Sequence, residues 1–508
     1  MEKAFWGMVA ACTLAFGILL VVYLNKTGVI DLAPKEVVEE TQPVTETEEE
    51  PDEIASLLAE TQNNYATAME AFEQEDTQTA LAENTTIVYE EVEKGGSVDP
   101  ERNGSHSNFM DEELTSQEES SEEQSSEEDK PETKSNKEYT YDLYKDHVVI
   151  KKYLGKKSDL VIPETIDDQP VTELEKSAFA SSKTLVKVDI PDSVTKMGDG
   201  VFKSNAALVE VIMPESLTEL GASAFDGCTS LVRITIPDGV TSIKDKTFNN
   251  CSSMTRVSFS SEITEIGIQA FNNCTSLQTI SLPAALTKIA DKAFFGCLKI
   301  DKIKIPSEVT TIGKSAFENC SAATSISMGN MVDTIGELCF KGCTSAETVK
   351  LSTALTEIPK ELFAGDTVFT ACKIPANVTK INQSAFEGCT GLEEITIPSA
   401  VKSIEQTAFS GCTGLTTLTL KSGVSVIGDS AFAGCTSLTA VEFPKSVVSI
   451  GTESFSGCSK LADVTIPKET LSVKAGAFAG CAFTTVTVNK ICSYQSDSFP
   501  TSCTVNTY

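Results

Sequence analysis

Phenylalanine recurs at a fixed interval through most of the chain. Each of 14 phenylalanines is separated from the next by 23 residues, without one slip: Phe179, Phe202, Phe225, Phe248, Phe271, Phe294, Phe317, Phe340, Phe363, Phe386, Phe409, Phe432, Phe455 and Phe478. A constant period of this length is typical of a solenoid, in which each repeat forms one turn and packs only on its neighbours. We therefore expect one coiled array, although a chain of 508 residues is too long for one ordinary compact domain.

Each repeat contains two short segments with strand-like alternation. The first carries Leu231, Ile234 and Ile236 and is closed by Pro237, and the second is centred near Ile243. Alternation of apolar and polar residues predicts short strands, and proline ends a strand because it lacks an N–H donor. A unit this small cannot enclose a core alone, so stacking must place Phe on Phe and Leu on Leu. At about 4.8 Å between strands, 14 turns would extend roughly 65 Å.

The repeat motif is clearest in residues 231–251, LVRITIPDGVTSIKDKTFNNC, and it resembles the leucine-rich repeats of the BspA-like surface proteins of bacteria and some protists. The lead-in LVIPETIDDQPVTELEKSAF, whose first unit is five residues longer between Pro163 and Phe179, also matches how such arrays begin. The resemblance covers residues 139–508. It implies a curved, right-handed leucine-rich-repeat coil with a parallel β-sheet on one face, exposure at a cell surface, and in some members attachment to host extracellular-matrix proteins or to other cells.

A cysteine stands three residues after the phenylalanine in 11 of the 14 repeats, beginning at Cys228, while Ser182, Asn205 and Asp366 take that position in the others. In leucine-rich repeats this turn position is Asn or Cys and faces inward, where it hydrogen-bonds the backbone of adjacent turns. We therefore interpret the ladder cysteines as buried thiols and not as disulfides, although stacked turns lie within bridging range.

Four further cysteines have different interpretations. Cys339 replaces the small residue before Phe340, and Cys372 takes an apolar position of an inner strand. Cys492 and Cys503 lie beyond the regular ladder, where a disulfide could fasten the C-terminal cap, and the spacing leaves their pairing open.

The N-terminal residues 4–24, AFWGMVAACTLAFGILLVVYL, form an uncharged run long enough to cross a bilayer as one helix. No small-residue cleavage site follows Leu24, so we predict an uncleaved anchor and not a signal peptide. Residues 9–12 resemble a lipoprotein cleavage box ending at Cys12, but the apolar run continues beyond that cysteine. We favour a short cytoplasmic N-terminus, with the repeats outside a single-pass membrane protein, although Lys3 and Lys26 flank the run on both sides.

Most of the negative charge lies between the anchor and the repeats. Residues 31–138 contain 33 acidic and 6 basic residues, and the whole chain has a formal charge of −33. Such a composition buries too little apolar surface to offset the entropy of ordering, so we predict a disordered linker. Within it, residues 54–72 have helical apolar spacing, which suits either a partner-binding helix or a transient one. The expected segments are an anchor (1–24), a linker (25–138), an N-terminal cap with the first repeat start (139–178), repeats (179–481) and a C-terminal cap (482–508).

Catalysis is not expected. The chain has two histidines, His106 and His147, which removes nearly every His-dependent catalytic arrangement. No phosphate-binding or dinucleotide glycine motif occurs, and the close pair Cys339 and Cys343 is explained by the repeat. We therefore predict a protein that is not an enzyme and needs neither cofactor nor metal. A nucleic-acid partner is also not expected, because no basic face extends over the domain.

The remaining candidate is a surface. Residues that alternate with the apolar positions of the inner strands should stand on the exposed face of the parallel sheet, and basic residues gather among them: Arg233, Arg256, Lys302, Lys304, Lys350 and Lys373. We hypothesise that they form a patch on the concave face that binds an extracellular protein, such as a matrix protein, or an acidic glycan. Two alternatives remain open: such residues simply suit exposed strands, or the patch holds the protein's own acidic residues 31–138.

These observations predict a membrane-anchored cell-surface leucine-rich-repeat protein that acts by binding, as an adhesin or a recognition module. The alternative is a structural or assembly component of the cell's own envelope.

Overall fold

The computed structural model describes residues 130–508. The predicted anchor, the predicted helix at residues 54–72 and nearly all of the predicted linker lie outside these residues. Within the described part, no helix is long and apolar enough to cross a membrane.

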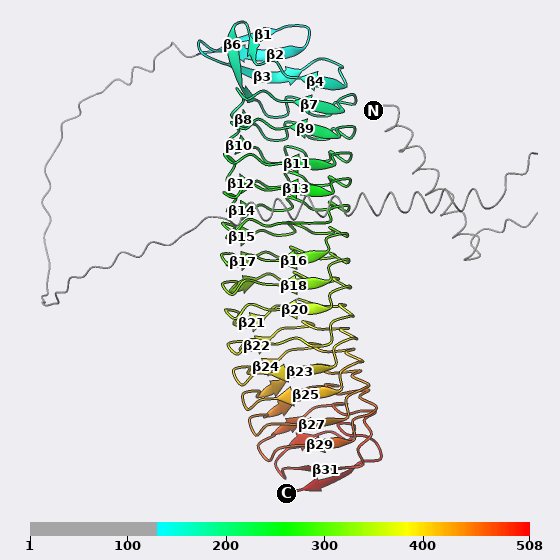
Figure 1. Ribbon diagram of the computed structural model, residues 1–508. Helices are drawn as coiled ribbons and strands as arrows, with labels where there is room; N and C mark the ends of the chain where they lie inside the picture. Colours follow the sequence, from blue (N-terminus) through cyan, green and yellow to red (C-terminus); the bar gives the residue numbers. More distant parts are fainter. Residues whose placement is uncertain (1–129) are drawn as a thin grey trace, which may run out of the picture. The chain divides into compact units, whose positions relative to one another are not determined.

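Residues 130–508 form a solenoid with two parallel ladders of short strands (Figure 1). The first ladder, here called the strand face, consists of β4 (Asp159–Val161), β7 (Lys187–Asp189), β9 (Glu210–Ile212), β11 (Arg233–Thr235), β13 (Arg256–Ser258), β16 (Lys302–Lys304), β18 (Ser325–Ser327), β20 (Thr348–Lys350), β23 (Glu394–Ile397), β25 (Thr417–Leu420), β27 (Ala440–Glu442), β29 (Asp463–Thr465), β31 (Thr485–Val488) and β33 (Thr504–Thr507).

The second ladder continues from a longer strand and has two residues per strand thereafter. Its members are β6 (Gln169–Leu174), β8 (Lys196–Met197), β10 (Glu219–Leu220), β12 (Ser242–Ile243), β14 (Glu265–Ile266), β15 (Lys288–Ile289), β17 (Thr311–Ile312), β19 (Thr334–Ile335), β21 (Glu357–Ile358), β22 (Lys380–Ile381), β24 (Ser403–Ile404), β26 (Val426–Ile427), β28 (Ser449–Ile450), β30 (Ser472–Val473) and β32 (Ser493–Tyr494). Register partners such as Ile243 and Ile266 are 23 residues apart. The predicted period is therefore the rise of one turn.

A column of aromatic rings fills the centre of the coil. All 14 repeating phenylalanines are buried, and successive ring centroids lie 5.0–5.8 Å apart in stacked geometry. Such offset stacking adds to the stabilisation from apolar burial. Tyr153 extends the column above Phe179 at 5.5 Å, and Phe499 extends it below Phe478 at 5.8 Å. The array therefore has about 16 turns, where the phenylalanine count predicted about 14.

The first unit is longer by five residues, as the sequence predicts. Asp159 of β4 pairs with Lys187 of β7, which is 28 residues later instead of 23. A small antiparallel hairpin formed by β5 (Thr165–Ile166) and β6 accommodates part of this unit, with Asp167 and Asp168 at its tip in the left-handed region.

The folded part begins before the boundary that we placed between residues 138 and 139. Strand β1 (Glu132–Ser135) pairs antiparallel with β2 (Tyr139–Leu143), which in turn pairs with β3 (Val148–Tyr153). The β1 sequence contains no apolar residue, so its composition resembles the acidic linker. Backbone pairing and polar contacts hold it, among them the Lys134–Asp167 ion pair at 3.3 Å.

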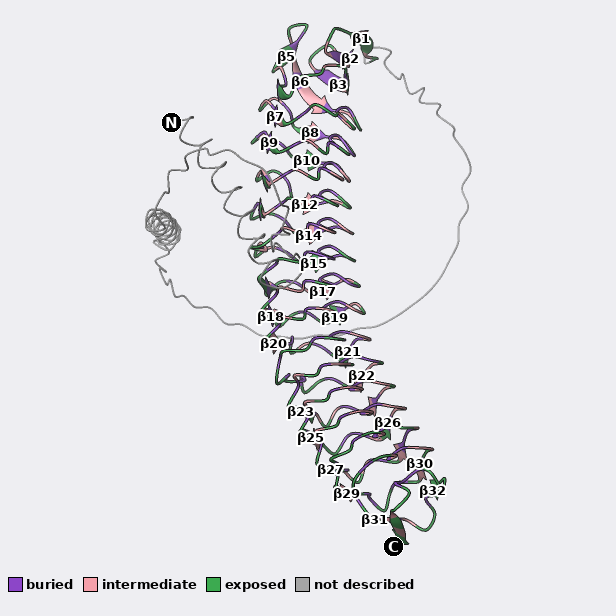
Figure 2. Cartoon of the chain, turned by 90° about the vertical axis from the view of Figure 1, so that its right-hand side faces the viewer, coloured by how far each residue is buried: buried purple, intermediate pink, exposed green. Residues whose placement is uncertain are grey.

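The expected curvature is absent from the first half of the array. From β7 to β20 the coil is close to straight in both views, and a bend follows below β20 (Figures 1 and 2). Both sides of each turn are hydrogen-bonded to the next turn with the same register, so neither side is longer than the other. The residues from Arg233 to Lys350 therefore lie on a nearly flat face and not on a concave one.

Candidate functional site

The strand face presents two outward rows of side chains. In β11, Arg233 and Thr235 are exposed, while Ile234 between them is buried. This is the ordinary alternation of a strand with one face on a core. The first row therefore contains Arg233 and its equivalents in other turns, and the second row contains Thr235 and its equivalents.

The structure places all six predicted basic residues on this face, each exposed. Arg233 and Arg256 are direct register partners in the first row. Lys302 and Lys304 both lie on β16, one in each row. Lys350 shares the second row with Lys304, two turns further along. Lys373 follows one turn later, outside any regular strand.

Between the turns of Arg233 and Lys373 the two rows contain no acidic residue. Glu210 lies one turn before this stretch and Glu394 one turn after it. Six steps separate the first turn from the last, which corresponds to about 29 Å at 4.8 Å per strand.

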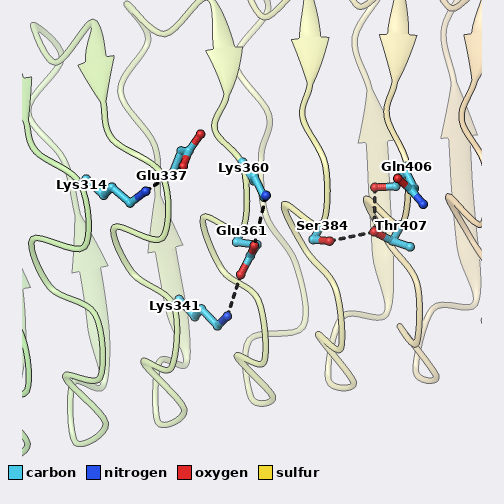
Figure 3. Close-up of polar contacts among 8 residues, drawn as sticks. All are labelled: Lys314, Glu337, Lys341, Lys360, Glu361, Ser384, Gln406 and Thr407. Carbon is cyan, nitrogen blue, oxygen red and sulfur yellow. Dashed lines mark hydrogen bonds and ion pairs between the residues drawn. The ribbon is translucent and has the colours of Figure 1, made fainter.

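Lysines elsewhere on the coil are neutralised by carboxylates on adjacent turns. On the second ladder, Lys288 lies 2.7 Å from Glu265. On the turns that carry the phenylalanines, Lys314 lies 3.1 Å from Glu337, and Glu361 receives both Lys341 at 2.6 Å and Lys360 at 3.7 Å (Figure 3).

The six basic residues of the strand face differ from these lysines. Among residues 130–508, none of the six has a carboxylate within 4.0 Å. Unpaired like charges on neighbouring strands repel each other, so the arrangement has no evident structural benefit. It does create a positive field along an otherwise acidic protein.

Open grooves run along the edge of the strand face, where the strands meet the following turns. One is lined by Ile212, Met213 and Arg233, another by Ser281 and Lys304, and the largest by Lys373 and Lys421. The sequence analysis missed Lys421 because it considered only the two strand rows. The available signal was that Lys421 takes the position that Pro398 and Pro444 occupy in the adjacent repeats.

The ladder cysteines serve the fold. Each of the 11 thiols donates a hydrogen bond of 3.1–3.5 Å to the carbonyl oxygen of the phenylalanine 26 residues earlier. Burial raises the pKa of thiols such as Cys228 and Cys412 to about 12, which suppresses the nucleophilic thiolate. The predicted inward hydrogen-bonding role is therefore confirmed, and Cys339 and Cys372 are also buried as predicted. Cys492 and Cys503 are not bridged.

One ladder position holds an acid. Asp366 is buried, neither of its carboxyl oxygens has a hydrogen-bond partner, and desolvation raises its pKa to about 8. A carboxyl group that keeps its proton at neutral pH can replace the thiol as a donor, but the position faces no cleft. Within residues 130–508, no group of three or more His, Cys, Asp or Glu side chains could hold a metal ion.

Comparison with known proteins agrees with this architecture. Residues 172–300, 266–393 and 379–506 match the family model described as BspA type Leucine rich repeat region, which is present in six copies. The chain belongs to the BspA-type leucine-rich-repeat family. Members of this family are repeat proteins of the surface-protein class, consistent with a binding or recognition module, and such folds typically bind partners and are not catalysts.

Solved structures include similar chains. A leucine-rich repeat protein from Bacteroides ovatus is 25% identical, with a TM-score of 0.56 over 73% of this chain and 98% of that one. A leucine rich cell surface protein from Faecalibacterium prausnitzii is 27% identical over 58% of this chain and 96% of that one, with a TM-score of 0.39. The pneumococcal vaccine antigen PcpA is 16% identical over 74% and 93%, with a TM-score of 0.39. No curated protein matches the chain.

Proposed function

We propose that this BspA-type protein is an adhesion or recognition module at the cell surface, anchored through residues 4–24, and that its strand face binds an anionic partner. The partner is an acidic glycan or an acidic extracellular protein. The repeats face outward from a single-pass membrane anchor, as the uncharged N-terminal run favours.

One observation carries the proposal: six exposed basic residues share a flat face about 29 Å long, with no carboxylate partner in residues 130–508. On the other faces cross-turn ion pairs neutralise comparable lysines, as Lys196 with Glu173 at 3.1 Å. An extended positive row of this kind complements an extended anionic chain and steers its approach.

Binding of the full chain in a mild detergent to immobilised heparin, acidic matrix proteins and isolated cell wall, across a salt series, tests the proposal. The variant replaces all six basic residues by Gln, and the control replaces six ion-paired lysines by Gln: Lys196, Lys244, Lys288, Lys314, Lys341 and Lys380. The strand-face variant should lose binding by about tenfold or more, or about 1.4 kcal/mol, and the control should not. Equal binding by both variants contradicts the proposal, and binding to the cell's own wall alone supports an envelope role.

A further inference from the structure

The strand ladder is interrupted at the turn that contains Lys373. Between β20 and β23, Ala371 makes only an isolated bridge to Glu394. This turn also exchanges the sizes of two core residues, because Phe369 takes the usual leucine position and Cys372 an aliphatic strand position, and both are buried. The larger and smaller side chains displace the segment from regular pairing.

A groove of about 790 Å³ opens at this interruption. Its volume lies within the range of about 300–1,000 Å³ that is usual for small-ligand sites. Its lining combines two lysines, one carboxylate and several hydroxyls with small apolar residues: Ala371, Lys373, Glu394, Thr396, Ser399, Lys421 and Ser422. None of the three charged side chains has an ion-pair partner within residues 130–508.

The turn that carries Lys421 is held rigidly. The Lys421 N–H donates a hydrogen bond of 3.1 Å to the Ile397 carbonyl, which the proline of neighbouring repeats could not do. Gly423 packs so closely on this turn that a Cβ atom there would lie 1.7 Å from the carbonyl oxygen of Ser399. The position of Lys421 at the groove is therefore fixed by its backbone.

The combination of charges distinguishes ligand classes. Lys373 and Lys421 lie two turns apart, or about 10 Å, and suit two anionic groups along one ligand. Glu394, between them in sequence, suits a hydrogen-bond donor that carries no charge, such as a sugar hydroxyl. An acidic peptide offers anionic groups but few hydroxyls, and Glu394 would repel it.

We propose that this groove binds a short anionic oligosaccharide, with its acidic groups at Lys373 and Lys421 and a ring hydroxyl donating to Glu394. This inference deepens the proposed function and rests on it. The acidic group of the sugar is a carboxylate or a sulfate, and the experiment separates the two.

Calorimetric titration of the full chain with trigalacturonate, a sulfated trisaccharide, maltotriose and hexaglutamate tests the groove. At least one anionic trisaccharide should bind, whichever acid it carries, and maltotriose and hexaglutamate should not. Lys421→Gln should weaken binding about tenfold, while Lys445→Gln, an exposed lysine one turn further along, and Arg233→Gln should leave it unchanged.

Glu394→Gln gives the decisive sign. Removing a negative charge should strengthen anion binding if the groove acts by charge alone, but should weaken it if Glu394 accepts a sugar hydroxyl. Stronger binding in this variant, or equal binding of hexaglutamate, overturns the inference. If heparin binds through Arg233 and Arg256 but neither trisaccharide binds, the groove is excluded and the proposed function stands. If a trisaccharide binds through Lys421 while heparin, acidic matrix proteins and cell wall do not, the groove stands and the extended face is excluded.

Discussion

The side-chain amide of Asn205 donates a 2.9 Å hydrogen bond to the backbone carbonyl of Phe179, in the preceding turn. Cys228, one repeat later, makes the equivalent contact from its thiol to Phe202 at 3.1 Å. Amide and thiol are therefore interchangeable at this position, because the fold requires a small donor that points inward. This relationship explains why cysteines recur along the chain without forming disulfides.

Asp366 should make folding stability depend on pH. Its pKa is about 8 in the folded chain because burial disfavours the charged carboxylate, whereas an exposed Asp titrates near 3.8. Below that lower value both states are protonated. Between the two values only the unfolded chain releases the proton, so stability should fall as pH rises, and should level off above the folded pKa.

Asp366→Asn, which copies Asn205, should therefore stabilise the protein at pH 8 and leave a smaller effect at pH 4, as measured by urea unfolding at both pH values. The backbone N–H groups of Gly342 and Cys343 face the carboxyl and oppose this shift, and the neighbouring ladder thiols are neutral. An advantage of the variant that shrinks as pH rises would refute a buried neutral carboxyl.

The phenylalanine column should be the main source of cooperativity between turns. Phe409 is fully buried and stacks on Phe386 at 5.0 Å and on Phe432 at 5.1 Å. Phe409→Ala should cost about 3–5 kcal/mol of unfolding free energy. Phe409→Leu, which keeps most of the volume, should cost clearly less in the same chemical denaturation experiment. Equal costs would mean that the ring volume is not what couples the turns.

The ladder thiols should resist alkylation until the chain unfolds. Iodoacetamide requires the thiolate, and burial raises the pKa of these thiols and blocks access. Peptide mapping after brief labelling should show Cys503, the least buried cysteine of residues 130–508, modified first. Rapid labelling of Cys274 or Cys412 in the native protein would contradict the buried ladder.

Arg256 should trade stability for binding. It lies beside Arg233 in parallel register, and like charges in this relation repel each other. Arg256→Thr should be neutral or stabilising by up to about 0.5 kcal/mol at low salt, with the gain disappearing at high salt. The same variant should bind heparin more weakly. A destabilised variant with unchanged binding would indicate a structural role.

The regular part of this fold was predictable because one residue type marks every turn. The period of 23 gave the register and the buried column directly. The end turns were missed because Tyr153 and Phe499 stand 26 and 21 residues from their neighbours and so leave the period. The curvature was wrong because it depends on the relative spacing of the two ladders, which a repeat motif does not encode.

The candidate site was predictable only in part. Alternation along each strand places Lys302 and Lys304 outward, so the exposed rows follow from the sequence. The absence of carboxylate partners depends on which side chains meet across turns, and the groove at Lys421 depends on one broken strand pairing and a displaced proline position. Neither feature has a local sequence signal strong enough to stand alone.

Lysine acetylation footprinting tests the role of the strand face most directly. The full chain would be labelled briefly with and without heparin, and modification at each lysine measured by mass spectrometry. Heparin should protect Lys302, Lys304, Lys350 and Lys373, while Lys196, Lys288 and Lys314 on the other faces keep their labelling. Uniform protection, or protection confined to the other faces while heparin is bound, would contradict a binding surface on the strand face.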